Sequence, residues 1–182
     1  FDKGLEAVKE SFLFVTLDDG LRSQYRVAEV ADDIFQASGI FIPLTFFVLT
    51  KFDDFTGEIS DVPDETPSYQ DGVHQFMSKG EILDLIKRGH RVENHTVNHA
   101  SLPTLPTGAR NAEVEVGEER ISALWRIAGR ERKNKLFAYP YGSYQDQVEY
   151  IRSLGYSLAF STIRSARHSS QDRYNLGRVG RT

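Results

Sequence analysis

The chain has 182 residues, of which 40% are hydrophobic and 26% charged, and its formal net charge at pH 7 is -4. These values are typical of one globular domain with a hydrophobic core. The acidic balance argues against a basic surface that binds nucleic acid. No cysteine is present, which excludes thiolate catalysis, disulfides and cysteine-ligated metals. Any metal site in this chain therefore uses His, Asp, Glu or water as ligands.

The sequence carries no visible targeting or membrane signal. No stretch reaches the roughly 18 apolar residues that span a bilayer, so we expect no transmembrane segment, and no secretory signal is recognisable at the start. The chain begins with Phe1 rather than Met. A cell-envelope, extracellular or cytoplasmic location therefore stays open, and so does the oligomeric state.

Short apolar runs alternate with amphipathic segments along the chain, which predicts an α/β fold with mainly parallel strands. Both a (β/α) barrel and an open doubly wound sheet agree with this order. Helices are predicted before Gly39, between Ser78 and Gly89, over 111–128 and before Gly155. The predicted strands cover residues 12–15, 44–49, 91–94, 136–139, 156–161 and 175–180.

Two of the predicted helices carry local signals of their own. Ser78 followed by Glu81 forms the pattern of a capping box at a helix start. In the first helix, apolar side chains recur at helical spacing, and we expect this face to be buried in the core. Its members are Val27, Val30, Ala31, Ile34 and Phe35.

Residues 51–76 interrupt the alternation of strands and helices. They are acidic, contain Pro63 and Pro67, and show no clean hydrophobic period. We predict a long surface loop or insertion here. It is either a wall of a substrate groove or a solvated loop without a role.

Two adjacent carboxylates, Asp18 and Asp19, follow the first predicted strand within Thr16-Leu17-Asp18-Asp19-Gly20. Asp-Gly is a common tight-turn signal, so this segment alone does not indicate a site. Neighbouring carboxylates after a buried strand repel one another and are costly to desolvate unless a positive group lies beside them. The pair therefore points to a positive partner.

The segment His95-Thr96-Val97-Asn98-His99 supplies a reason for such a partner. On a helical turn, two imidazoles four residues apart project from the same face and can hold one ion. Thr96 occupies the place of the Glu in the His-Glu-x-x-His protease pattern, and we expect its hydroxyl to brace the turn. One Asp and two His leave metal positions open for water and substrate, as catalytic sites do.

Three segments together resemble the polysaccharide deacetylase family, also called the NodB-homology or carbohydrate esterase family 4 group. The segment 16–20 is similar to the family's Thr-Phe-Asp-Asp-Gly motif, with Leu in place of Phe. His95, Thr96 and His99 match its His-Ser/Thr-x-x-His motif, and Pro140-Tyr141-Gly142 matches the end of its third motif. With further similarities between these motifs, the resemblance runs from about residue 12 to the end of the chain.

The resemblance implies a fold and a set of metal ligands. The fold is a single-domain distorted (β/α) barrel of the NodB-homology, or glycoside hydrolase/deacetylase, type over residues 1–182. Asp19, His95 and His99 are implied as ligands of a divalent ion, with zinc expected first and Co, Ni, Mn or Fe as alternatives. Asp18 is then the general base that activates water.

The third motif is expected to serve the substrate. The backbone N–H of Tyr141 is a natural donor to the oxyanion that forms when the acetyl carbonyl is attacked. Tyr139, Pro140 and Gly142 are expected to contact the substrate, with an aromatic ring stacked on a sugar.

Two departures from the family pattern concern the proton-handling half of the site. The third motif often begins with an Arg, but Ala138 occupies that position. We expect Arg178 or Arg181, from the end of the chain, to orient Asp18 instead. The family's late Leu-x-x-x-His motif, which supplies a general acid, has no match, and the surroundings of His168 differ from it. The general acid therefore has no assignment.

The leading functional hypothesis is metal-dependent removal of N-acetyl groups from sugar residues of an oligo- or polysaccharide. The same metal site would also serve O-acetyl esters or a non-sugar amide. A non-catalytic glycan-binding protein is a further alternative, but retention of all three ligands and Asp18 argues against it. An iron oxygenase with two His and one carboxylate fits the ligand types, but not the fold pattern or the adjacent Asp18. The sugar, its linkage and the native metal are open at this point.

Overall fold

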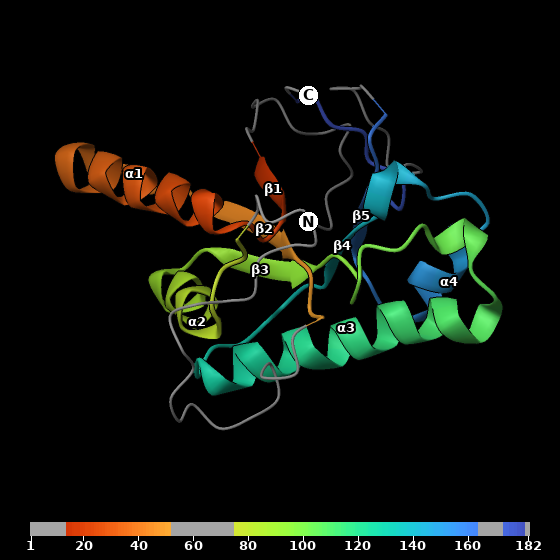
Figure 1. Cartoon of the computed structure of the whole chain (residues 1–182). Coiled ribbons are helices and arrows are strands. Elements are labelled where there is room, and N and C mark those ends of the chain that lie inside the picture. The colour runs from red at the N-terminus through yellow and green to blue at the C-terminus, as the bar shows by residue number, and fades with distance from the viewer. Residues whose placement is uncertain (1–13, 52–74, 164–172, 181–182) are drawn as a thin grey trace.

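The computed structural model describes residues 14–51, 75–163 and 173–180, and these form a curled parallel sheet covered by helices (Figure 1). The five strands lie in sequence order, and each pairs in parallel with the next. They are β1 (Val15–Asp19), β2 (Leu44–Val48), β3 (Arg91–Asn94), β4 (Leu136–Ala138) and β5 (Leu158–Phe160).

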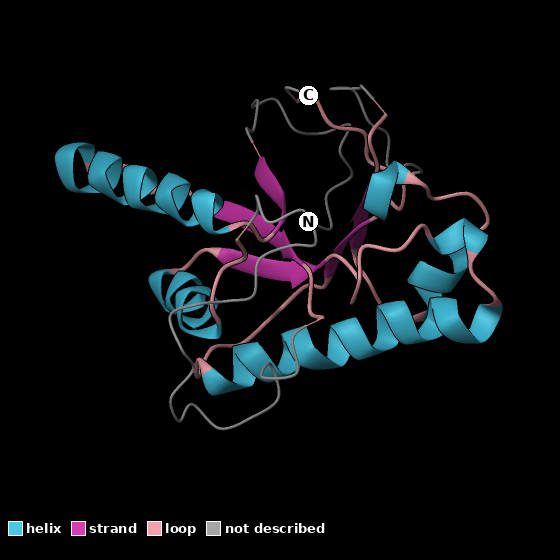
Figure 2. Ribbon diagram, viewed as in Figure 1, coloured by secondary structure: helices cyan, strands magenta, loops and turns pink. Residues whose placement is uncertain are grey.

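Helices connect successive strands and lie outside the curl of the sheet (Figure 2). A doubly wound sheet reverses its strand order at a switch point, whereas a barrel places each strand beside its predecessor. The unbroken order of the five strands therefore decides for half of a (β/α) barrel. The helices are α1 (Arg22–Ser38), α2 (Lys79–Arg88), α3 (Thr107–Ile127) and α4 (Val148–Ser153), with short 3-10 turns η3 (Leu102–Thr104) and η4 (Pro140–Gly142).

The start and end of α2 follow directly from local chemistry. The Ser78 hydroxyl accepts the backbone N–H of Glu81, and the Glu81 carboxylate accepts the backbone N–H of Ser78, so the predicted capping box is confirmed. Gly89 ends the helix at φ 98°, a left-handed conformation that glycine adopts at little steric cost.

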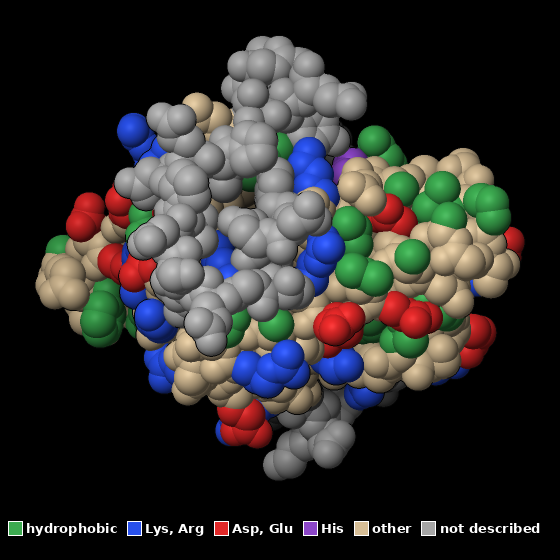
Figure 3. Space-filling model, turned by 60° about the horizontal axis from the view of Figure 1, so that its bottom comes forward, with side chains coloured by type: hydrophobic (Ala, Val, Ile, Leu, Met, Phe, Trp, Pro, Cys, Tyr) green, Lys and Arg blue, Asp and Glu red, His purple; other side chains and the backbone are tan. Residues whose placement is uncertain are grey.

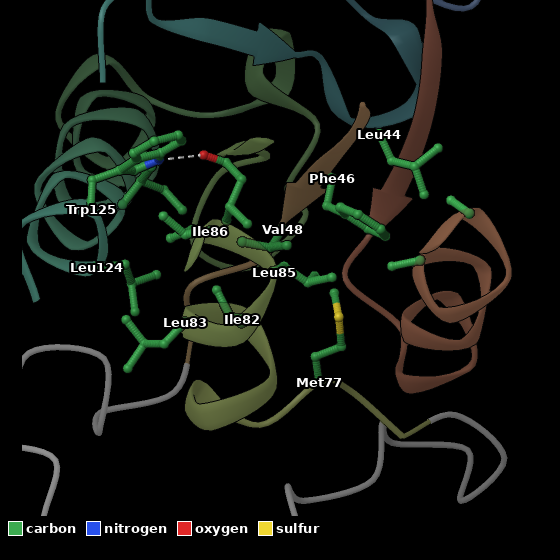
Figure 4. Packing of buried hydrophobic residues seen from close by; sticks show 14 residues of the cluster. Leu44, Phe46, Val48, Met77, Ile82, Leu83, Leu85, Ile86, Leu124 and Trp125 are labelled. Carbon is green, nitrogen blue, oxygen red and sulfur yellow. Dashed lines mark hydrogen bonds between the residues drawn. The ribbon is translucent and has the colours of Figure 1, made fainter. Parts of the chain in front are cut away.

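The main hydrophobic core lies between the sheet and the inner faces of α1, α2 and α3 (Figure 4). Each large side chain buried here contributes roughly 1.5–3 kcal/mol relative to exposure. Trp125 of α3 also donates its indole N–H to the carbonyl of Val92 in β3 at 2.8 Å, which fixes the helix against the strand. Further buried members of this core are Leu44, Phe46, Val48, Met77, Ile82, Leu85, Ile86 and Leu124.

The buried face of α1 differs from the prediction. The side chains of α1 that are buried are Ala28 and Ala31, whereas the larger apolar side chains of the predicted face are at least 39% exposed. Figure 1 shows α1 extending well beyond the sheet, so the described core offers it only a narrow strip. Periodicity identified the apolar stripe but not how much of it the sheet covers. The exposed members are Val27, Val30, Ile34 and Phe35.

Several predicted boundaries also shift. β1 continues through Asp18 and Asp19, because both pair with β2. Of the predicted strand 12–15, the structure describes Phe14 and Val15, and Val15 begins β1, while residues 12 and 13 lie outside the described residues. No described residue of the predicted strand 175–180 is in a strand; Leu176 makes one isolated bridge with Phe160. Most of the predicted loop 51–76 lies outside the described residues.

Neither the charged side chains on the surface nor the helices are unusual for a globular protein. On the face shown in Figure 3, acidic and basic side chains are interspersed rather than gathered by sign, which is usual for globular proteins. Among the described residues, no helix combines the length and apolar character needed to cross a bilayer.

Gly117 allows α3 to approach β3 closely, and this contact yields a prediction. A Cβ at Gly117 would lie 2.6 Å from Oδ1 of the buried Asn94. Ala normally stabilises a helix interior over Gly by about 0.5–1 kcal/mol, but here the clash should dominate. We expect Gly117→Ala to lower the free energy of unfolding, measured by urea denaturation, by about 1–3 kcal/mol.

Gly108 provides the matched control on the same helix. A Cβ there would meet no atom within 4 Å, so Gly108→Ala should leave stability unchanged or raise it slightly. Equal stability of the two variants would show that the approach of α3 to Asn94 is not tight.

Candidate metal centre and active site

The two carboxylates end β1 at the carboxyl edge of the sheet, the edge that carries active sites in (β/α) barrels. Asp19 and Gly20 both have left-handed backbone conformations, with φ of 77° and 74°. A side chain at Gly20 would put its Cβ 3.0 Å from the side chain of Val48 in β2. Glycine is therefore required at this turn, which directly follows the two aspartates.

His95 directly follows β3 and is almost fully buried. Its Nδ1 lies 2.8 Å from the carbonyl oxygen of Ala138. Because a carbonyl only accepts, Nδ1 is the donor in this contact, and the neutral tautomer with its proton on Nδ1 offers the Nε2 lone pair to a metal. Ala138, where the family often has Arg, thus contributes through its backbone to the orientation of a candidate ligand.

The segment from His95 to His99 is an irregular turn, so the predicted helical turn is wrong. Thr96 and His99 have positive φ values of 71° and 61°, which no α-helix contains. The Thr96 hydroxyl accepts the backbone N–H of His99 at 3.1 Å, as expected of its bracing role. The two imidazoles converge through this turn rather than through helical spacing.

Asp19, His95 and His99 come together at one point, with one potential ligand atom of each within 4.8 Å of the others. Oδ1 of Asp19 lies 3.4 Å from Nε2 of His95 and 3.3 Å from Nε2 of His99. A tetrahedral zinc ion with bonds of about 2.0–2.1 Å separates its ligand atoms by roughly 3.3 Å. The spacing of the carboxylate to each imidazole therefore fits one such ion.

The protonation of His99 also suits a metal ligand. Burial lowers the pKa of His99 below its usual value, and the neighbouring His95 lowers it further, while Asp19 and Asp18 act in the opposite direction. The imidazole is therefore biased toward the neutral form, which is the form that binds metal.

Asp18 is held by Arg178 through two parallel hydrogen bonds. Nη1 and Nη2 of Arg178 donate to the two carboxylate oxygens, each at 2.6 Å. Nη1 also donates to the Thr16 hydroxyl and Nε to the carbonyl of Ser161, so the guanidinium itself is fixed in place. This bidentate geometry orients a carboxylate strongly. Arg181, the alternative partner of Asp18, lies outside the described residues, as does His168.

The third motif forms η4, with Tyr141 at its tip. Tyr141 has a φ of 58°, is 65% exposed, and its ring centroid lies 4.5 Å from that of His99. Gly142 is required behind it, since a Cβ there would lie 2.6 Å from the backbone nitrogen of Thr162. The turn thus presents an aromatic side chain beside the candidate metal ligands.

The other predicted substrate-binding residues of this motif are buried. Tyr139 is 1% exposed and donates its hydroxyl to the carbonyl of Tyr174, so its ring has no free face for a sugar. Pro140 and Gly142 are likewise buried. In this arrangement they support the turn, and Tyr141 is the exposed aromatic residue of the motif.

The sequence analysis did not identify two residues that contact the turn 95–99, hereafter the His turn. Asn94, fully buried, accepts the backbone N–H of Thr96 and donates to Val114 and Tyr156. Glu113 of α3 accepts N–H groups of the turn. The available signal was a carboxylate beside the apolar face of a predicted helix, which does not by itself identify a partner.

A curled parallel sheet with clustered carboxylates and imidazoles at its carboxyl edge has the arrangement of a (β/α) barrel enzyme. The sequence model of the polysaccharide deacetylase family matches residues 6–159, and the chain belongs to this family. No curated relative matches the chain closely enough to add to this assignment.

Solved structures share the fold. A Bacillus cereus polysaccharide deacetylase has a TM-score of 0.66 at 20% identity, covering 91% of this chain and 46% of its own. Streptococcus pyogenes deacetylase PplD has a TM-score of 0.67 at 20% identity, with coverages of 95% and 65%. IcaB from Ammonifex degensii has a TM-score of 0.64 at 26% identity, with coverages of 96% and 70%. The chain thus spans less than half the length of the first of these proteins.

The converging donors predict a zinc site that can be measured without substrate. Changing a partner of a metal ligand commonly costs 10–100-fold in affinity, so loss of a ligand itself should cost about 100-fold or more. We expect His99→Ala and Asp19→Asn each to show this loss in a chelator competition assay with zinc.

His90 offers a control for the loss of an imidazole. It is buried and accepts the N–H of Leu44 at the other end of β2, away from Val48. His90→Gln should keep the zinc affinity of the unchanged protein. Undiminished zinc affinity in His99→Ala and Asp19→Asn would rule out this site.

Proposed function

We propose that the protein is a divalent-metal-dependent hydrolase that removes acetyl groups from N-acetylated sugar residues of a glycan. Membership of the polysaccharide deacetylase family supports sugar deacetylation. The observation that carries the proposal is the pairing of two neighbouring groups: the Asp19-His95-His99 cluster, and Asp18 held by Arg178. Together these provide ion ligands and an adjacent oriented base.

Asp19, His95 and His99 would hold the ion, and three protein ligands leave positions open for water and substrate. When bound, a divalent ion polarises the acetyl carbonyl and lowers the pKa of a water molecule from 15.7 to about 7. The ligand spacing described above agrees with tetrahedral zinc, and Co, Ni, Mn or Fe accept the same nitrogen and oxygen donors.

Asp18 is proposed to accept the proton of the attacking water. Arg178 occupies one lone pair on each carboxylate oxygen, and a carboxylate oxygen has a second that can accept. The hydrogen bonds that Arg178 donates to the Thr16 hydroxyl and the Ser161 carbonyl keep the pair from rotating. Arg178 is therefore proposed to orient the base. In this role it replaces the Arg of the family's third motif, whose position is occupied by Ala138 in this chain.

Tyr141 is proposed to serve the substrate in two ways. Its backbone N–H would donate to the oxygen on which negative charge develops. Its exposed ring beside His99 offers an apolar face to a sugar ring. The Streptococcus pyogenes relative was solved in complex with acetate, the product that this reaction would release.

Acetate release is the direct test of this function. With zinc present, we expect release from N-acetylglucosamine oligomers to exceed release from acetylated xylan or small amides. Asp18→Asn should lower kcat by about 100–10,000-fold, because the amide cannot accept the proton, while zinc affinity stays within a few-fold.

Each alternative substrate has its own signature. Preferred release from xylan or small amides would reassign the substrate, and glycan binding without any acetate release would favour a non-catalytic role. Full activity of Asp18→Asn would remove Asp18 from the mechanism.

Arg178 provides a separate prediction about orientation. Arg178→Lys keeps the positive charge but cannot make the two parallel hydrogen bonds to Asp18. We expect kcat to fall by about 10–100-fold, since one misplaced catalytic group can cost this much, with zinc affinity unchanged. Arg152→Lys is the matched control, because Arg152 pairs with Glu149 at the exposed surface. An unchanged kcat in Arg178→Lys would contradict the orienting role.

A further inference from the structure

The turn that carries His99 is held in a conformation that its own residues disfavour. Thr96 and His99 both have positive φ, and such conformations cost most for β-branched residues such as Thr. A turn of this kind persists only where its surroundings supply compensating contacts. The position of His99 relative to His95 therefore depends on whatever holds the intervening backbone.

Each backbone N–H from Thr96 to His99 is taken up by an acceptor. Asn94 accepts that of Thr96, and the Thr96 hydroxyl accepts that of His99. The two in the middle, from Val97 and Asn98, both donate to Oε2 of Glu113, at 3.1 and 2.8 Å. These middle groups thus share one carboxylate oxygen from a different element, α3.

Glu113 makes further contacts with the same turn. Its Oε1 accepts the side-chain amide of Asn98 at 2.7 Å, and its backbone carbonyl also accepts the N–H of Val97. The residue is 9% exposed. Within the described part of the chain, no Lys or Arg lies at ion-pair distance from it. Its carboxylate is therefore committed to the turn alone.

The packing of α3 on β3 brings this carboxylate to the turn. Gly117 lies four residues after Glu113, hence on the same face of the helix, and it leaves room for Asn94. Asn94 in turn donates to the carbonyl of Val114. These contacts join the end of β3 to one face of α3, next to the His turn.

We infer that Glu113 is a positioning residue for the metal centre, which sets the place of His99 relative to His95 through the backbone of Val97 and Asn98. The inference rests on the proposed metal-dependent function. It adds a residue outside the three sequence motifs and assigns α3 a role in metal affinity. Glu113 itself contacts no predicted ligand side chain in the described hydrogen bonds.

Zinc affinity of the full chain, measured by chelator competition, tests the inference. Removal of a group that orients a metal ligand typically weakens metal binding 10–100-fold, so Glu113→Ala should lose about this much. Glu113→Gln keeps one oxygen that can accept both backbone N–H groups, and should recover to within about threefold of the unchanged protein. The absorption spectrum of the Co(II)-loaded protein should shift in Glu113→Ala and return in Glu113→Gln.

Two control variants separate positioning from general stability. Glu119→Ala removes an exposed carboxylate from the same helix and should leave zinc affinity unchanged. Ile121→Val truncates the buried core face of α3 and should lower the thermal unfolding midpoint without changing zinc affinity.

The outcomes distinguish this inference from the function on which it rests. If the unchanged protein binds no zinc, the proposed metal centre fails and the inference with it. If the unchanged protein binds zinc and Glu113→Ala binds it within twofold, only the positioning role is overturned. A zinc loss in Ile121→Val equal to that in Glu113→Ala would reduce Glu113 to a contributor to stability.

Discussion

The register of three neighbouring strands is the constraint on which the site depends. Parallel pairing places Asp19 of β1 beside Val48 of β2, and Val48 beside Asn94 of β3. The N–H of His95 then donates to the carbonyl of Val48, which continues the row by one residue. A slip of one residue would turn every side chain to the opposite face. The meeting of Asp19 with the imidazoles is thus set by backbone hydrogen bonds.

The site combines this rigid edge with backbone conformations of high energy. Asp19, Thr96, His99 and Tyr141 all have positive φ, although residues other than glycine rarely adopt it. Each such residue costs of order 1–3 kcal/mol, and the hydrogen bonds that the backbone of the His turn donates to Asn94 and Glu113 offset part of this cost. Backbone strain is thus concentrated at the site, where side chains converge, and contacts with neighbouring elements offset part of its cost.

A buried ionic network connects two strands of the sheet with α3. Glu93 of β3 is fully buried, and its carboxylate accepts the N–H of Leu136 at the start of β4 and the guanidinium of Arg132. Arg132 also pairs with Glu118 of α3 at 2.6 Å. Removing one partner of such a network would leave a buried charge uncompensated. The network thus connects β3, which His95 directly follows, with β4 and α3, which carry Ala138 and Glu113.

The features predicted well from the sequence are those with local causes. The capping box at Ser78 and the strand 91–94 depend on a few adjacent residues, and the structure has both as predicted. The motif residues were recognisable because their types and short spacings carry the chemistry. The burial of the apolar face of α1 and the strand at 175–180 were predicted wrongly. Local periodicity does not show how much of a segment other elements cover or pair with.

The sequence by itself determined which residue types are available to the site: two adjacent carboxylates, two imidazoles four residues apart and a Pro-Tyr-Gly turn. The alternation of strands and helices left a barrel and a doubly wound sheet open, and the barrel implied by the family resemblance is confirmed by the strand order. Only the tertiary structure places Asp19 beside the two imidazoles and Asp18 against Arg178. Arg178 is 160 residues from Asp18 in sequence, and Glu113 is 15 residues from Asn98. Such pairs form because strand order and helix packing bring distant segments together, and no local pattern encodes that distance.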